Sequence, residues 1–201
     1  MALRSALKRF GRARSGLAAL EFALTAPLMI VLLITSIELI NALQTNRRVE
    51  NTAASLSDVV SRDTEISNAE LSGLWSAVTP LMYPDPSVGV DIRLTSISID
   101  SAGKGRVVWS EQCAITANGS CGGGTFSDLS DNSLIPANEL PASNTPNSSL
   151  IRVEIVYDYT PILGFFYVDG DRELTRDSGV IPLRHTSYRR SRLVDPIPRV
   201  S

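Results

Sequence analysis

The residues that could perform chemistry are few and widely separated in this chain of 201 residues. It contains one histidine, His185, and two cysteines, Cys113 and Cys121. Nucleophilic or acid–base catalysis needs a reactive group, a base and an orienting group within hydrogen-bond reach, and no serine, lysine or carboxylate pair lies in a motif of that kind. The glycines at 122–124 are not followed by Lys-Ser/Thr, as a phosphate-binding loop requires. The sequence predicts no catalytic residues, no cofactor and no enzyme activity.

The most unusual acidic residue, Glu21, lies near the start of a long apolar stretch. Between Leu17 and Leu43 the only charged residues are Glu21 and Glu38. This span of roughly 27 residues exceeds the ~20 that an α-helix needs to cross a bilayer core, so we expect a transmembrane helix over residues 17–43. A carboxylate inside such a helix costs about 2.5–3.5 kcal/mol on insertion scales, which predicts a functional role and a partner for Glu21.

The charged residues that precede this helix are all basic. The leader contains Arg4, Lys8, Arg9, Arg12 and Arg14 and no acidic residue. By the positive-inside rule the N-terminus stays in the cytoplasm, and the chain after Leu43 lies on the other side of the membrane. Residues 44–201 are then enough for one exported domain.

The residues at the start of the helix resemble a type IV pilin-like processing site. A basic leader is followed by Gly16, four small or apolar residues, and then Glu21 and Phe22 at the opening of the helix. This order is similar to that of prepilin peptidase substrates. With Pro27 farther along and Glu38 near the far end, the segment resembles the TadE-like minor pseudopilins of the tight-adherence (Tad/Flp) type IV pilus system.

The resemblance covers about residues 10–45 and implies that a prepilin peptidase cuts between Gly16 and Leu17, removing residues 1–16. The new amino group of Leu17 would lie near Glu21 of its own chain or of a neighbour, and each charge would reduce the cost of the other. It further implies a single-pass protein of the bacterial inner membrane, with a periplasmic domain, that acts in pilus assembly or initiation and so in adhesion and biofilm formation. The implied partners are the peptidase, other pilins and pseudopilins, inner-membrane assembly proteins and the membrane. Entry into the extracellular fibre stays open.

Other interpretations compete with this one. A secretory signal peptide is disfavoured because a carboxylate opens the apolar run, the run is too long and no small-x-small cleavage site follows. An ordinary anchor could carry an incidental Glu21 that reaches the interface. The rival of another class is an uncleaved, membrane-anchored periplasmic binding module that uses the cysteine loop and the apolar stretch Pro161–Val168. That stretch could equally be buried, lie on the membrane or contact another subunit.

Charge gives no reason to expect nucleic-acid binding. The formal net charge is −2 and the isoelectric point is about 5.5, whereas nucleic-acid-binding domains are typically basic. Positive charge gathers at the two ends, and the C-terminal cluster comprises Arg184, Arg189, Arg190, Arg192 and Arg199. We expect a solvated surface there, with contact to an anionic head group or partner as the alternative.

The two cysteines predict a disulfide. Seven residues rich in turn formers separate Cys113 from Cys121. In an exported domain such a pair closes a short loop, which stabilises by roughly 2–3 kcal/mol in the chain-entropy model. No metal site is expected, because the thiols lack partner ligands at zinc spacing and His185 is remote. Residues 169–173 lack the ligand order of a calcium loop and are expected to form a tight turn.

Two helices are predicted before the sheet. Residues at helical spacing continue one apolar face beyond the membrane, so the first helix should extend to Val60; these residues are Val49, Ala53, Leu56 and Val60. Pro27 should kink the first helix. Ser67 and Glu70 have the spacing of a capping box and predict a second helix over residues 68–81, which Pro80 and the next two prolines should stop. Trp75 is expected to be a core anchor.

From residue 88 the apolar period changes to two, which predicts antiparallel strands. The alternation from Val90 to Leu94 continues in the opposite phase at Ile97, so we expect a bulge near Ser96. Residues 106–112 should form the second strand of a hairpin. Residues 150–159 should form the central strand.

The remaining segments are predicted to be a long loop and one or two strands at the edge of the sheet. Residues 113–149 should form a long surface loop. Residues 174–187 should supply one or two last strands at an edge, because Pro182 cannot donate to a ladder. Together these patterns predict an α+β protein with a long N-terminal transmembrane helix, a second helix and an antiparallel sheet of about four to five strands. The predicted divisions are residues 1–16, 17–43 and 44–201.

Overall fold

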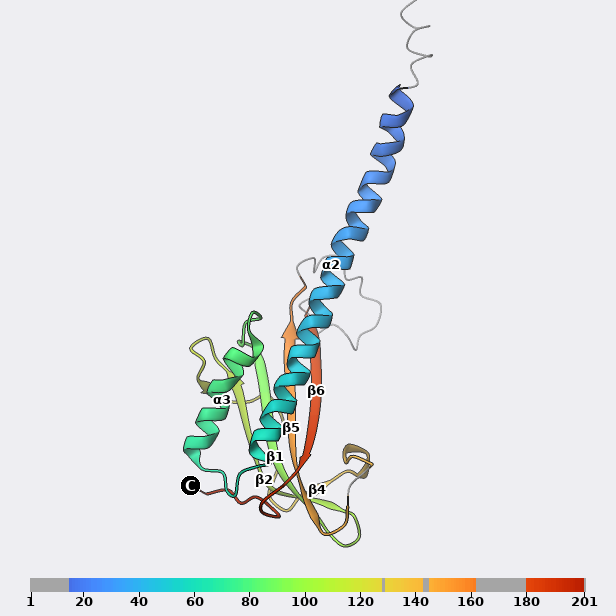
Figure 1. Cartoon of the computed structure of the whole chain (residues 1–201). Coiled ribbons are helices and arrows are strands. Elements are labelled where there is room, and N and C mark those ends of the chain that lie inside the picture. Colours follow the sequence, from blue (N-terminus) through green and yellow to red (C-terminus); the bar gives the residue numbers. More distant parts are fainter. Residues whose placement is uncertain (1–14, 128, 143–144, 162–179, 201) are drawn as a thin grey trace, which may run out of the picture. The chain divides into compact units, whose positions relative to one another are not determined.

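The computed structural model describes residues 15–127, 129–142, 145–161 and 180–200. The chain forms two compact units, Met1–Asn41 and Ala42–Ser201. Figure 1 shows its elements, which confirm the expected α+β class. In order they are α2 (Ser15–Val60), α3 (Asn68–Met82), β1 (Val90–Ile99), β2 (Gly105–Ile115), β3 (Cys121–Gly122), β4 (Leu134–Ile135), the 3-10 turn η1 (Ala137–Glu139), β5 (Ser148–Tyr159) and β6 (Ile181–Arg190).

Helix α2 extends through Pro27 and ends at Val60, as the apolar spacing predicts. Within the second unit its apolar stripe is buried against the sheet and α3. Complete burial of a Val or Leu side chain stabilises by about 1.5–3 kcal/mol, so these positions hold α2 to the domain. The stripe consists of Val49, Ala53, Leu56 and Val60.

Helix α3 begins with the predicted capping box. The backbone N–H of Ser67 donates to Oε2 of Glu70 at 2.6 Å, and the backbone N–H of Glu70 donates to Oγ of Ser67 at 3.3 Å. The helix predicted over residues 68–81 is confirmed to within one residue, because α3 ends at Met82, with Pro80 in its last turn and Pro84 just beyond it. Pro80 removes only one backbone donor in the last turn. Burial of Met82 beside Thr52 of α2 offsets that loss.

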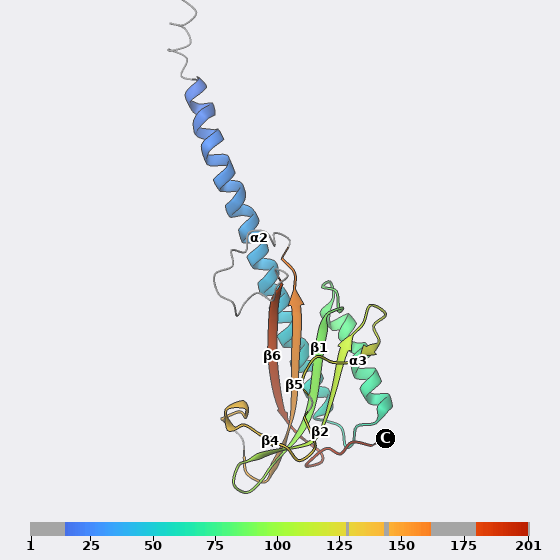
Figure 2. The same ribbon diagram turned by 180° about the vertical axis from the view of Figure 1, so that it is seen from behind.

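The sheet is antiparallel, with the order β3-β2-β1-β5-β6 and with β4 also paired to β2. Figure 2 shows its four long strands from the side opposite the helices. Strand β5 is paired on both sides, but β1 holds the middle of the order, so the prediction of a central β5 is wrong by one place. The reason is β3, which adds a strand beyond β2 from a segment predicted to be loop. Strand β6 lies at the edge, as expected.

The irregularity expected near Ser96 is present, although the extra residue lies in the partner strand. Ser96 pairs with Trp109 and Ile97 pairs with Val107, so Val108 of β2 is the bulged residue. Strand β1 keeps its alternation throughout. The apolar phase change instead places Ile97 on the opposite face of the sheet from Leu94.

Each face of the sheet therefore has its own core. The main core lies between the sheet and the two helices, and it contains Trp75, as predicted, together with Trp109. The smaller core lies on the other face, where β4 and the turn after it cover the sheet. Its buried members are Ile97, Ile99, Val107, Ile135 and Leu150.

The C-terminal segment is docked on the domain, in contrast to the solvated tail that its charge suggested. Ile197 is fully buried, and its carbonyl oxygen accepts a hydrogen bond from Nε1 of Trp109 at 2.8 Å. Arg199 lies beside Ile66 in a parallel bridge, and its Nε donates to Oε1 of Glu111 at 3.1 Å. The exposed members of the basic cluster are Arg184, Arg189 and Arg190 of β6 and Arg192 just after it.

Four predicted features lie wholly or partly outside the described residues: the basic leader up to residue 14, most of the apolar stretch 161–168, the turn at 169–173 and the start of the predicted strand segment 174–187. The segment 113–149 is not a plain loop, because β3, β4 and η1 lie within it.

Candidate functional site: the apolar helix and the polar face of the sheet

The apolar part of α2 presents its large side chains to the outside. Phe22 is 71% exposed, and the large apolar residues from Leu24 to Leu43 are also mostly exposed. The helix is long and apolar enough to cross a membrane, with a mean hydropathy of 2.2 in its most apolar window. An apolar surface of this size is unfavourable in water, so it suits contact with lipid or with neighbouring apolar helices. This arrangement indicates a membrane anchor.

Gly16 and Glu21 both lie in the first turns of α2. A side chain added at Gly16 would meet no atom within 4 Å in the described part of the chain. Glu21 is exposed, and its carbonyl oxygen accepts a hydrogen bond from Oγ1 of Thr25 at 3.0 Å. The structure places both residues on the helix but supplies no partner chain, so their role in processing stays a prediction. Glu38 lies farther along the same apolar helix.

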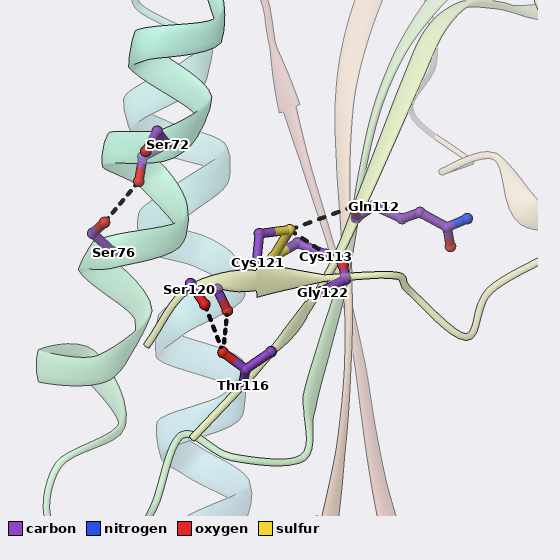
Figure 3. Close-up of a disulfide and its surroundings, with 8 residues drawn as sticks. All are labelled: Ser72, Ser76, Gln112, Cys113, Thr116, Ser120, Cys121 and Gly122. Carbon is purple, nitrogen blue, oxygen red and sulfur yellow. Dashed lines mark hydrogen bonds between the residues drawn. A yellow bond between two sulfur atoms is a disulfide. The ribbon is translucent and has the colours of Figure 1, made fainter. Parts of the chain in front are cut away.

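The predicted disulfide joins Cys113 to Cys121, with a Cα–Cα distance of 5.2 Å. Figure 3 shows how it links β2 to the short strand β3. The turn between them is closed by hydrogen bonds from both the backbone N–H and Oγ1 of Thr116 to the carbonyl oxygen of Ser120, each at 2.9 Å. Gly119, with a φ of +72°, takes the left-handed conformation that this turn requires. The bond therefore holds an added strand on the sheet.

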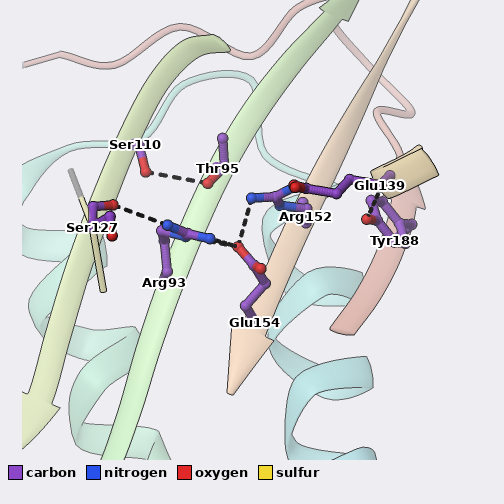
Figure 4. A network of polar contacts seen from close by, with 8 residues as sticks. All are labelled: Arg93, Thr95, Ser110, Ser127, Glu139, Arg152, Glu154 and Tyr188. Atoms are coloured by element: carbon purple, nitrogen blue, oxygen red, sulfur yellow. Dashed lines mark hydrogen bonds and ion pairs between the residues drawn. The ribbon is translucent and has the colours of Figure 1, made fainter. Parts of the chain in front are cut away.

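A charged cluster lies on the sheet face opposite the helices (Figure 4). Arg152 of β5 is only 1% exposed and makes ion pairs with Glu139 at 2.9 Å and with Glu154 at 2.8 Å. Glu154 also pairs with Arg93 of β1 at 2.7 Å. Burial alone would lower the pKa of Arg152, but the carboxylates of Glu154 and Glu139 raise it, so the guanidinium stays charged.

Arg93 is further held by groups outside the strands. Its Nη1 donates to the carbonyl oxygen of Ser127 at 3.0 Å, and its guanidinium lies 4.7 Å from the ring centre of Phe126. The cluster thus pairs two arginines with two glutamates. It joins β1, β5 and η1, which indicates a structural role.

The sequence analysis did not predict this cluster. Alternation alone separates Arg152 and Glu154 from the apolar face, but their contact with Arg93 depends on the pairing of Arg93 with Glu154 in the register. Among the residues that the structure describes, no group of three or more His, Cys, Asp or Glu side chains could hold a metal ion.

Comparison with known families gave one finding. The family model described as TadE-like protein matches residues 16–56, all within α2. This match confirms the resemblance that the motif around Gly16 predicted, and it supports involvement in the Tad pilus system, with other pilus components as partners. Residues 57–201, which include the sheet, lie outside the match. Comparisons with curated proteins and with solved structures found no match.

Proposed function

We propose that this protein, whose residues 16–56 match the TadE-like model, is a minor pseudopilin of the tight-adherence pilus. A prepilin peptidase cuts between Gly16 and Leu17, and the mature chain then acts in assembly or initiation of the fibre. Residues 1–16 are the leader, 17–43 the transmembrane helix and 44–201 the periplasmic domain. The observation that carries the proposal is the family match, which begins at the glycine of the predicted cleavage site.

The surroundings of Gly16 support a role in recognition by another protein. Space for a side chain is open at this position, so packing in the described residues does not explain the glycine. A peptidase that needs the backbone to approach closely would explain it.

The role proposed for Glu21 follows from helix geometry. After cleavage, the α-amino group of Leu17 would lie four residues before Glu21, and such positions are neighbours on a helix surface. An ammonium and a carboxylate that meet inside a membrane stabilise each other much more than they would in water. The pair forms within one chain or between adjacent chains, and pairing between chains would align their helices at the start of assembly.

The size of the exported domain favours a minor subunit. The unit Ala42–Ser201 contains the sheet, the end of α2, α3 and both cores. The major subunits of the family that it resembles are very short. A domain of this size suits a component that starts or caps assembly, and the proposed partners are other pilins, pseudopilins and inner-membrane assembly proteins.

The test is the N-terminal sequence and intact mass of the protein recovered from membranes of cells with and without the cognate peptidase. We expect a start at Leu17 only in cells that have the peptidase. A start at Met1 or Ala2 in both strains would refute the cleavage and leave the uncleaved periplasmic module as the explanation.

Two variants separate recognition from assembly. Gly16→Leu should block cleavage without disturbing the domain, because the side chain meets open space. Glu21→Gln should abolish pilus production while the protein is still made and inserted. Glu38→Gln is the matched control, since it removes the other carboxylate of the same apolar stretch. Equal loss of pili in both glutamine variants would contradict a specific role for Glu21.

A further inference from the structure

We propose that the loop between α3 and β1, residues 83–89, docks on the phospholipid headgroup layer of the membrane that the chain's own apolar helix enters. The proposal rests on the membrane anchor and on neither cleavage nor pilus assembly. The contacts from which it is argued all lie within the unit Ala42–Ser201.

The loop exposes two large side chains with apolar surface, Tyr83 and Val88. Its sequence is Tyr-Pro-Asp-Pro-Ser-Val-Gly, and Tyr83 is 78% exposed. Val88 is exposed too, as is Leu81 in the last turn of α3. Exposed groups of large apolar side chains mark contact surfaces. Tyrosine is enriched where membranes meet water, because its ring is apolar and its hydroxyl can remain hydrated.

The one charge in the loop is already neutralised by the helix. Oδ2 of Asp85 lies 2.5 Å from Nη1 of Arg48 in α2. The loop can therefore approach a lipid surface without bringing an unpaired carboxylate to the anionic headgroups. Arg47, the residue before, is exposed and has no acidic partner in the described ranges, so its guanidinium is available to lipid phosphates.

The same ion pair sets the distance of the loop from the membrane. Arg48 lies five residues after Leu43, the last residue of the predicted span, which corresponds to about 8 Å along a helix. The headgroup region on each side of a bilayer is about 5–8 Å thick. Asp85 is thereby held at the outer boundary of that layer, within side-chain reach of it.

The folded domain itself begins at this level. Ala42 packs against the main core, and Thr45 is buried. Figure 1 shows the α3–β1 loop at the same end of the domain as this part of α2. The core therefore begins within a few residues of the end of the predicted span, and the proposal places this end of the domain at the membrane surface.

The test uses the full-length chain in vesicles of phosphatidylcholine and phosphatidylglycerol, with a spin label at one introduced cysteine. Both native cysteines are joined in the disulfide, so labelling is specific. The label is placed at Tyr83→Cys or, as the matched control, at Leu134→Cys. Leu134 is also exposed, but it lies on β4, which pairs with the opposite end of the sheet. The ten residues of β1 put these ends about 30 Å apart.

We expect the label at position 83 to be several-fold less accessible than the label at 134 to a water-soluble nickel chelate, and more accessible to oxygen. Equal nickel accessibility in protein that resists carbonate extraction would overturn the docking while leaving the anchor in place. Carbonate-extractable protein would overturn both. Protection that disappears when the chain is diluted in lipid would assign the loop to a second copy and refute the lipid contact.

Discussion

Removing Glu154 should destabilise the domain far more than removing its partner Arg152. The two side chains belong to one ion-pair cluster, but their surroundings differ. Glu154 is the acid shared by two arginines, and Arg152 is the more deeply buried of the two, at 1% exposed. Glutamate 139, the second acid of Arg152, is 47% exposed and can return to water.

The magnitudes follow from what each substitution leaves behind. Glu154→Gln leaves Arg152 and Arg93 facing each other without their shared charge. Breaking a buried pair by removing one partner costs about 3–5 kcal/mol, and the remaining bond to Glu139 places the expected loss near the lower limit, about 3 kcal/mol. Arg152→Met leaves Glu154 paired with Arg93 at 2.7 Å and adds apolar volume to a buried position. Its expected cost is within about 1 kcal/mol.

The assay is urea unfolding of the detergent-solubilised full chain, followed by tryptophan fluorescence. Trp75 and Trp109 are both buried in the main core and report on its loss. A lower midpoint at unchanged slope measures lost stability. The matched control is Asp58→Asn, because Asp58 also bridges two arginines, Arg62 and Arg192, but at the surface. Exposed pairs contribute about 0–1 kcal/mol, so this variant should unfold almost as the wild type does.

The test is the order in which the three variants lose free energy of unfolding. If Arg152→Met lost as much stability as Glu154→Gln, or more, then the shared carboxylate would not be what the cluster depends on. If Asp58→Asn were as damaging as Glu154→Gln, burial would not be the cause of the cost.

Two further predictions concern local features. Replacing Cys113 and Cys121 together by alanine should lower the free energy of unfolding by about 2–3 kcal/mol, and reducing the wild type should reproduce the loss in urea midpoint; an unchanged midpoint in both would show that β3 does not need the bond. Ser67→Ala should cost about 1 kcal/mol by removing the helix cap. Hydrogen bonds from the backbone and hydroxyl of Ser67 lower the pKa of Glu70, so its stabilising effect is present above the ordinary value of 4.5 and is lost as the pH falls through the lower folded-state pKa. Thermal melts from neutral to acidic pH should therefore show the difference between the wild type and Ser67→Ala narrowing in acid, because the hydroxyl then no longer donates to a charged carboxylate. A difference that stays constant with pH would contradict this.

The elements that the sequence predicted correctly depend on residues close together in the chain. The capping box joins Ser67 to a residue three positions away, and the disulfide closes a loop with a sequence separation of eight. The apolar run and the helical spacing of the stripe up to Val60 each lie within one helix, so neighbouring residues suffice to predict them. The motif around Gly16 likewise lies within a few residues. The family match supports it, although cleavage itself remains a proposal.

Local patterns were less reliable where two segments meet. The phase change near Ser96 correctly located an irregularity, but the extra residue is Val108 of the partner strand. The loop at residues 83–89 was visible only as prolines expected to end a helix. Its exposure and its link to Arg48 depend on a contact across 37 positions.

The sequence by itself determined the two helices, the long strands, the apolar stretch of α2 and the disulfide, but it predicted as loop the segment that holds β3, β4 and η1. Tertiary structure alone decided the strand order, the cluster that joins Arg93 to Glu154 across 61 positions, and the burial of Ile197 beside Ser96, 101 positions earlier. The physical reason is that alternation specifies the face of a strand but not its neighbour or register. Those are chosen by the combined burial of both cores and the pairing of charges that no single segment contains.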